Sequence, residues 1–122
     1  MSISFKEAVG VHADALHLRA ERTRVLAANI ANENTPNFEA RDMDFGAMLE
    51  RLRDDGASAE LPEFGADAQA LYRVPYHPSR DGNTVEIGVE QAAFSQNSSD
   101  FQTSLTFAAM KFKGLAKAIG GQ

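Results

Sequence analysis

The sequence predicts a mainly α-helical fold, in which long N- and C-terminal helices pair as a coiled coil and enclose a short irregular or β-hairpin middle segment. Two observations carry this prediction. Apolar residues recur at alternating steps of four and three near both ends of the 122-residue chain, which is the periodicity of paired helices. The segment between them is rich in Gly, Pro and acidic residues, which disfavours further long helices. The length fits one modest core.

The N-terminal helix is expected within residues 1–34. It should end near Asn32, because Pro36 disfavours helical geometry at the residue before it, and the asparagines nearby tolerate a left-handed cap. Its predicted contact row, read in steps of four and three, consists of Val9, Ala13, Leu16, Ala20, Thr23, Ala27 and Ile30.

The C-terminal helix is expected over residues 90–122, with its end at Gly120. Two starts are open: near Glu90, or at the capping-box pattern Ser99 to Gln102. The predicted contact row is Phe94, Ser98, Phe101, Leu105, Ala108, Phe112, Leu115 and Ile119. These larger side chains are expected to pack against the small residues of the first helix, so that the two helices approach closely. The terminal helices together would form the axial coiled-coil domain.

The central segment, residues 35–89, divides into three expected parts. A short helix is predicted over residues 45–53 from apolar residues at helical spacing. A mobile acidic loop is predicted over about 54–69. A small hairpin is predicted between residues 71–75 and residues 84–89, because apolar residues alternate after a turn signal at residues 79–83.

Charge is distributed unevenly along the chain. The net charge is −5, with +1 in residues 1–32, −8 in residues 33–90 and +2 in residues 91–122. An acidic chain disfavours binding to nucleic acid or to an anionic membrane. The absence of cysteine excludes disulfides and thiolate chemistry. No apolar stretch approaches the roughly 20 residues of a membrane span, and the N-terminal residues do not resemble a cleavable signal peptide.

The sequence offers little for catalysis or metal binding. Asp14, His17 and Glu21 share one turn-face of the first helix, but helical metal sites need such residues from several helices, and after Glu90 at its start the second helix has only Asp100 as an acidic residue. We therefore expect no catalytic residue, no metal site and no cofactor.

A second apolar face on each terminal helix points to assembly. On the first helix, apolar residues also recur every seven positions on the side away from the first row, at Val11, Leu18 and Val25. On the second helix, the reverse side carries Phe107 and Met110. One partner helix cannot cover both faces. We expect the excess apolar surface to contact other chains, since the only further helix predicted is short.

Several separated motifs carry a resemblance to a known family. The run from Leu26 to Arg41 resembles the signature of bacterial flagellar axial proteins, the rod, hook and hook-associated subunits. Residues 41–45, 71–75, 81–85 and 105–115 are similar to the proximal rod members. The signature-turn residues, by this resemblance, are Asn29, Asn32, Thr35, Pro36 and Phe38. Asn37 stands where the family usually has glycine and Phe38 where it has tyrosine; Asn tolerates positive φ and Phe keeps the ring, so we expect the turn to survive.

The resemblance implies a structural subunit of the flagellar basal-body rod, which spans the periplasm. It implies that the chain assembles with itself and with other rod subunits, and that the flagellar type III export apparatus exports it without a cleaved signal peptide. A non-closing contact between such subunits would propagate an open assembly. Two alternatives remain at this point: a helical adaptor or export-chaperone-like binding protein, and a small helical enzyme with a metal at Asp14, His17 and Glu21.

Overall fold

The computed structural model describes residues 5–55 and 71–120 and is mainly helical, as predicted. In chain order the elements are α1 (Phe5–Ala31), β1 (Arg41–Asp42), α2 (Phe45–Asp55), β2 (Leu71–Tyr72) and α3 (Ile87–Ile119). The greater part of the acidic loop expected over residues 54–69 lies outside the described residues.

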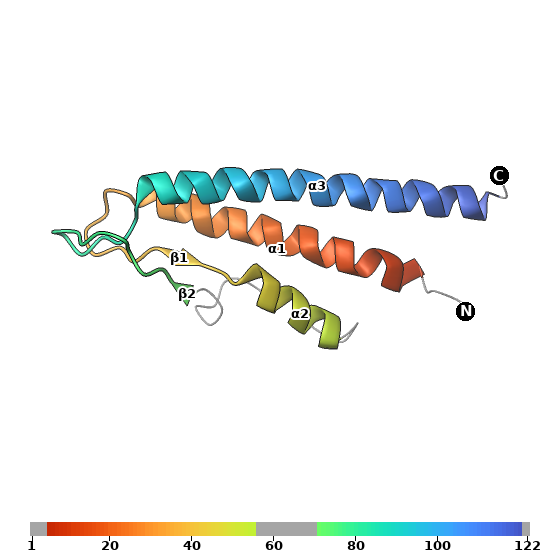
Figure 1. Ribbon diagram of the computed structural model, residues 1–122, viewed down its shortest axis with the longest axis horizontal. Helices are drawn as coiled ribbons and strands as arrows, with labels where there is room; N and C mark the ends of the chain where they lie inside the picture. The colour runs from red at the N-terminus through yellow and green to blue at the C-terminus, as the bar shows by residue number, and fades with distance from the viewer. Residues whose placement is uncertain (1–4, 56–70, 121–122) are drawn as a thin grey trace.

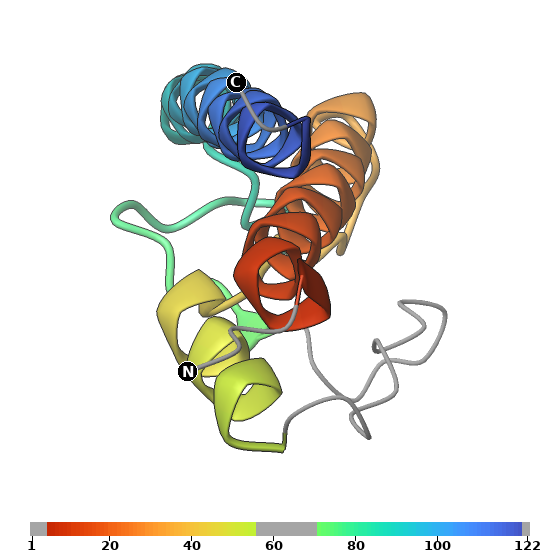
Figure 2. The same cartoon turned by 90° about the vertical axis from the view of Figure 1, so that its right-hand side faces the viewer.

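The three helices are arranged with α1 in the middle. The long helices α1 and α3 run side by side in opposite directions, and α2 lies along α1 on another side (Figures 1 and 2). Within the described residues α1 contacts both other helices, whereas α2 and α3 do not contact each other. The turns and the two short strands lie toward the end of the helix pair that is opposite the chain termini (Figure 1). Among the described elements, α3 therefore packs against α1 alone.

Local hydrogen bonds explain where the helices begin and end. At the end of α1, the Asn32 side chain donates to the Ala28 carbonyl at 2.7 Å and accepts from the Thr35 hydroxyl at 3.0 Å. Asp44 caps α2 by accepting from the amide of Ala47 at 3.2 Å. Helix α3 begins at Ile87, so it runs without a break through the capping-box pattern at residues 99–102.

The signature turn and the turn at residues 79–83 each contain one described residue with positive φ. Asn37 has φ 61° and Gly82 has φ 77°, and the amide of Asn37 donates to the Asp81 carbonyl at 2.9 Å. The expectation that asparagine supports the turn in place of glycine is confirmed by this φ. A Cβ added at Gly82 would lie 2.6 Å from the side-chain oxygen of Asn37. Glycine is therefore needed at position 82 for both its conformation and its size.

We expect Gly82→Ala to lower the free energy of unfolding by about 1–3 kcal/mol, because it adds backbone strain and a steric clash. Urea denaturation followed by circular dichroism measures the change. Gly88→Ala is the matched control: Gly88 lies in α3 with open space around it, so alanine there should raise stability by about 0.5–1 kcal/mol. Equal effects of the two substitutions would contradict the assigned role of Gly82.

The predicted hairpin is wrong in its pairing. Strand β2 pairs antiparallel with β1, with Arg41 opposite Tyr72 and Asp42 opposite Leu71. Residues 84–86 form no strand, and residues 87–89 begin α3. The physical reason is that Thr84 is bound elsewhere: its amide donates to the Phe38 carbonyl at 2.9 Å, and its hydroxyl accepts from the amide of Ala40 at 2.7 Å.

The predicted contact rows between the long helices are correct in part. Thr23 contacts α3, and Phe94, Phe101 and Leu115 are half-buried. Other residues of these same two predicted rows are exposed, namely Ala13, Ala20, Ala27, Leu105, Phe112 and Ile119. Asn97 and Glu90 take the corresponding places in the α1–α3 interface. An apolar pattern could not identify these rows because two of the buried contact residues are polar.

The core cluster corrects the expectation that the second apolar face of α1, which contains Leu18 and Val25, contacts other chains. Leu18 is 0% exposed and packs with Met43 and Met48, and Val25, Phe45 and Leu49 pack around them. Helix α2 and the residues before it therefore cover Leu18 and Val25 within the chain. The argument that a short third helix cannot cover this face is wrong for these two residues, because α2 lies directly against them.

Candidate assembly interface

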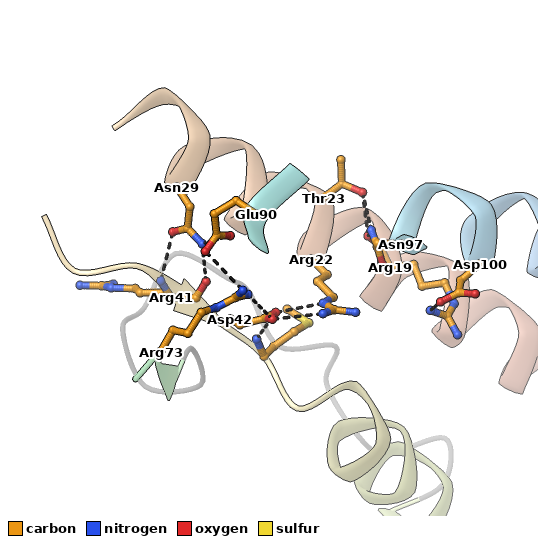
Figure 3. A network of polar contacts seen from close by, with 11 residues as sticks. Arg19, Arg22, Thr23, Asn29, Arg41, Asp42, Arg73, Glu90, Asn97 and Asp100 are labelled. Atoms are coloured by element: carbon orange, nitrogen blue, oxygen red, sulfur yellow. Dashed lines mark hydrogen bonds and ion pairs between the residues drawn. The ribbon is translucent and has the colours of Figure 1, made fainter. Parts of the chain in front are cut away.

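A buried asparagine joins α1, β1 and α3. Asn29 is almost completely buried, and its side-chain amide donates to the Arg41 carbonyl at 2.6 Å and to Glu90 Oε2 at 3.0 Å (Figure 3). Its Oδ1 accepts from the amide of Arg41 at 3.0 Å. Helix α1, strand β1 and helix α3 thus meet at one side chain near the end of α1.

Two arginines and two carboxylates extend this junction. Arg22 of α1 donates twice to Asp42, at 2.9 and 3.1 Å, and Arg73 bridges Asp42 at 2.6 Å and Glu90 at 3.3 Å (Figure 3). The hydrogen bond to Asp42 raises the pKa of Arg22 above its ordinary value, and outweighs burial, which acts in the opposite direction. Positive and negative groups alternate in this series of ion pairs. Each charged side chain therefore has a partner of opposite charge, which offsets the cost of removing it from water.

Asn83 holds the turn after α1. Its side-chain amide lies 2.8 to 2.9 Å from the carbonyls of Asn32, Glu33 and Thr35, and its Oδ1 accepts from the amide of Val85 at 2.7 Å. These carbonyls follow the last turn of α1, where backbone acceptors lack helical partners. Asn83 therefore fixes the start of α3 relative to the end of α1.

Asn97 makes a polar contact within the helix pair. Its amide donates to the Arg19 carbonyl at 2.9 Å and to the Thr23 hydroxyl at 2.8 Å (Figure 3). Arg19 also pairs with Asp100 at 3.3 Å and lies 3.9 Å from the centre of the Phe45 ring. A buried Asn between paired helices specifies register, because any shift along the axis breaks its hydrogen bonds.

The predicted assembly residues fall into distinct environments. Leu16, Val25, Ile30, Phe94, Phe101 and Leu115 are half-buried and Leu18 is fully buried. The exposed ones are Ala13, Ala20, Ala27, Leu105, Phe107, Met110, Phe112 and Ile119. The side chains of Val9 and Val11 lie outside the described residues. The exposed large apolar side chains of this set all belong to the C-terminal half of α3.

The signature turn is partly exposed. Asn29 is buried, Asn32 and Phe38 are half-buried, and Thr35 and Pro36 are exposed. A second exposed apolar group, which the sequence reading did not predict, lies at β2 and just after it: Leu71, Tyr72, Val74 and Tyr76.

Sequence reasoning missed the residues that build the junction. Asp42, Arg73, Asn83, Glu90 and Asn97 carry most of its hydrogen bonds and ion pairs. One signal was available: Glu90 and Asn97 are seven residues apart, which places both on the same side of a helix. Polar residues seven positions apart are compatible with a buried polar row. The charge of Glu90, taken alone, instead favours a position in solvent.

Two further observations concern chemistry. In residues 5–55 and 71–120, no three His, Asp or Glu side chains are grouped so as to hold a metal ion, and this range includes Asp14, His17 and Glu21. None of the helices in these ranges is both long enough and apolar enough to cross a membrane.

Comparison with known proteins gives consistent matches. A family model described as flagella basal body rod protein matches residues 10–38, which run from α1 into the signature turn. The flagellar basal body rod protein FlgB of Cereibacter sphaeroides strain ATCC 17029 is 46% identical, covering 97% of this chain and 98% of the relative. FlgB of Aeromonas hydrophila is 42% identical over 100% and 99% of the two chains. FlgB of Salmonella typhimurium strain LT2 is 38% identical over 88% and 89%.

Proposed function

Because this chain belongs to the family of flagellar basal body rod proteins and is a structural subunit of the rod, we propose that it assembles through exposed faces of its long terminal helices. The observation that carries the proposal is the exposed apolar surface of α3. Leu105, Phe107, Met110, Phe112 and Ile119 are all about half exposed or more. Such a concentration of large apolar side chains on one half of a helix is typical of an interaction surface.

The polar junction supports this role from the other end of the molecule. It fixes α1, α3 and the strands relative to one another through Asn29, Asp42 and Glu90, so the exposed face of α3 is carried on an ordered support. An interface that is ordered before binding loses less conformational entropy on assembly. We therefore propose that the junction has a structural role and takes no part in a reaction.

The proposed partners are other copies of this chain and other rod subunits of the flagellar basal body, where the chain is placed by its family. We also propose that the flagellar type III export apparatus delivers it without removal of a signal peptide, and that it binds no nucleic acid. Its role requires no catalytic residue and no cofactor.

We expect Leu105→Asp to prevent incorporation into the rod while leaving the fold of the free chain intact. Leu105 is half exposed in the free chain, but an aspartate there would bring an unpaired charge into an apolar contact, at a cost of several kcal/mol. The measurement is the amount of this chain in purified basal bodies, together with swimming motility.

Thr106→Asp is the matched control, since Thr106 is the next residue along α3 and is also exposed. It should retain incorporation and motility. Normal motility of the Leu105→Asp strain would show that this face of α3 is not an assembly surface, while loss of helicity in the purified variant would point to a defect of folding.

A further inference from the structure

The segment from Tyr72 to Tyr76 has its apolar side chains outside and its charged side chain inside, the reverse of an ordinary surface strand. Side chains alternate between its two sides. Tyr72, Val74 and Tyr76 face outward, with 58%, 84% and 78% of their surface exposed. Arg73, between them, turns inward with a side chain only 16% exposed and binds Asp42 and Glu90. The charged residue is thus inside and the apolar residues are outside, which is costly unless another surface covers the outer side.

This outer row, called here the aromatic strip (Tyr72, Val74 and Tyr76), is held in place by its backbone. The amide of Arg73 donates to the Ala40 carbonyl at 2.9 Å, and the amide of Tyr76 donates to the Glu86 carboxylate at 2.6 Å. Arg41 lies 5.1 Å from the centre of the Tyr72 ring and donates to its hydroxyl at 3.2 Å. A fixed row of apolar side chains is preorganised to receive a partner.

A complementary surface lies on the outer side of α3. Four exposed residues share one side of the helix because of their spacing: Phe107, Met110, Lys113 and Lys117. They are called here the lysine face. No acidic residue occurs after Asp100, so this face is positively charged. An apolar surface edged by lysines fits a partner that combines aromatic rings with negative charge.

The end of the molecule that carries the aromatic strip has this character. Glu33, Glu39 and Asp81 are exposed in the turns at this end and outnumber the exposed cation beside them, Arg80. Glu39 precedes Ala40, whose carbonyl accepts from the amide of Arg73 beside the strip. The turns of Glu33 and Asp81 are joined to each other, since Asn83 donates to the Glu33 carbonyl and the amide of Asn37 donates to the Asp81 carbonyl. Strand β2 lies toward one end of the elongated fold and the last turns of α3 lie at the other, so one copy cannot bring the two surfaces together (Figure 1).

We propose that the lysine face of one copy packs against the aromatic strip of a second copy of this chain, head to tail. This inference rests on the proposed function and specifies one contact within it. Two different surfaces at opposite ends give a contact that does not close on itself and continues from copy to copy. A two-fold pairing of lysine faces would instead place lysines against lysines, which is unfavourable.

Cysteine cross-linking tests this contact, because the chain has no native cysteine. Full-length Val74→Cys and Met110→Cys chains with different tags are mixed and treated with a short bismaleimide, in solution and in basal bodies from cells that produce both. We expect a cross-linked pair that contains both tags. Ala92→Cys, exposed on α3 and about 27 Å from Met110 along the helix, replaces Met110→Cys in the control and should give none. Adding Lys113→Glu and Lys117→Glu to the Met110→Cys chain should lower the yield at least about threefold.

The outcomes separate the contact from the rod function. Cross-links only between two Met110→Cys chains would overturn the head-to-tail contact in favour of a two-fold one. Absence of the mixed pair from basal bodies that do contain both variants would overturn the contact and leave the rod function standing. Absence of even the unmodified chain from basal bodies would count against the proposed function, while a mixed pair in solution would still support the contact.

Discussion

The isolated chain is expected to lose about 3–5 kcal/mol of its free energy of unfolding when Asn29 is replaced by alanine. The change removes three hydrogen bonds and leaves the amide and carbonyl of Arg41 and the buried Glu90 carboxylate without this partner. Each such group costs about 1–3 kcal/mol when it stays buried. Urea denaturation followed by circular dichroism at 222 nm measures the loss.

Two further variants show whether the amide itself is responsible. Asn29→Asp keeps the shape but replaces the donor with an acceptor facing Glu90, so it should be at least as destabilising as alanine. Asn34→Ala removes an exposed asparagine five residues later and should change stability by less than about 0.5 kcal/mol. If Asn29→Asp were as stable as the parent chain, donation to Glu90 and Arg41 would not be what holds the junction.

The second large effect is expected at Leu18. Leu18→Ala should lower the free energy of unfolding by about 2–5 kcal/mol, because it leaves a cavity among Met43, Met48 and the side chains around them. The same denaturation experiment measures it. Leu105→Ala deletes the same atoms at an exposed position and should cost less than about 1 kcal/mol in the free chain.

This pair of variants also tests how the chain covers its own apolar surface. If Leu18→Ala left the free chain unchanged and impaired only assembly, then α2 would not cover α1 in solution, and the original expectation that this face contacts other chains would be restored. A loss of stability in the free chain assigns Leu18 to the internal core.

The long helices and the short α2 could be predicted because their causes are local. Pro36 and the asparagines near it stop α1, and apolar spacing from Phe45 marks α2. The turn at Asn37 could also be predicted, since few residues other than glycine adopt positive φ readily.

The pairing of strands and the facing rows of the helices could not be predicted in the same way. Arg41 pairs with Tyr72 across a long stretch of chain, whereas sequence patterns favour the nearest alternating segment. Asn97 and Glu90 are buried beside partners on α1 and at Arg73, just after β2, and those partners are known only once the fold is known. A reading that equates burial with apolar character therefore selected Leu105 and Phe112, which are exposed.

The junction at Asn29 has a consequence for the order in which the helix pair forms. Joining two distant segments costs loop-closure entropy once, at the first contact, and little for each neighbouring contact afterwards. The Asn29–Glu90 bond and the turn held by Asn83 link α1 to α3 across the shortest stretch of intervening chain. Pairing of the helices is therefore favoured first at this end, and the Arg19–Asp100 contact closes a longer loop. The last turns of α3 pair with α1 at the end of this sequence, so the half of α3 that carries the exposed apolar residues is the last part of the helix pair to become ordered in the free chain.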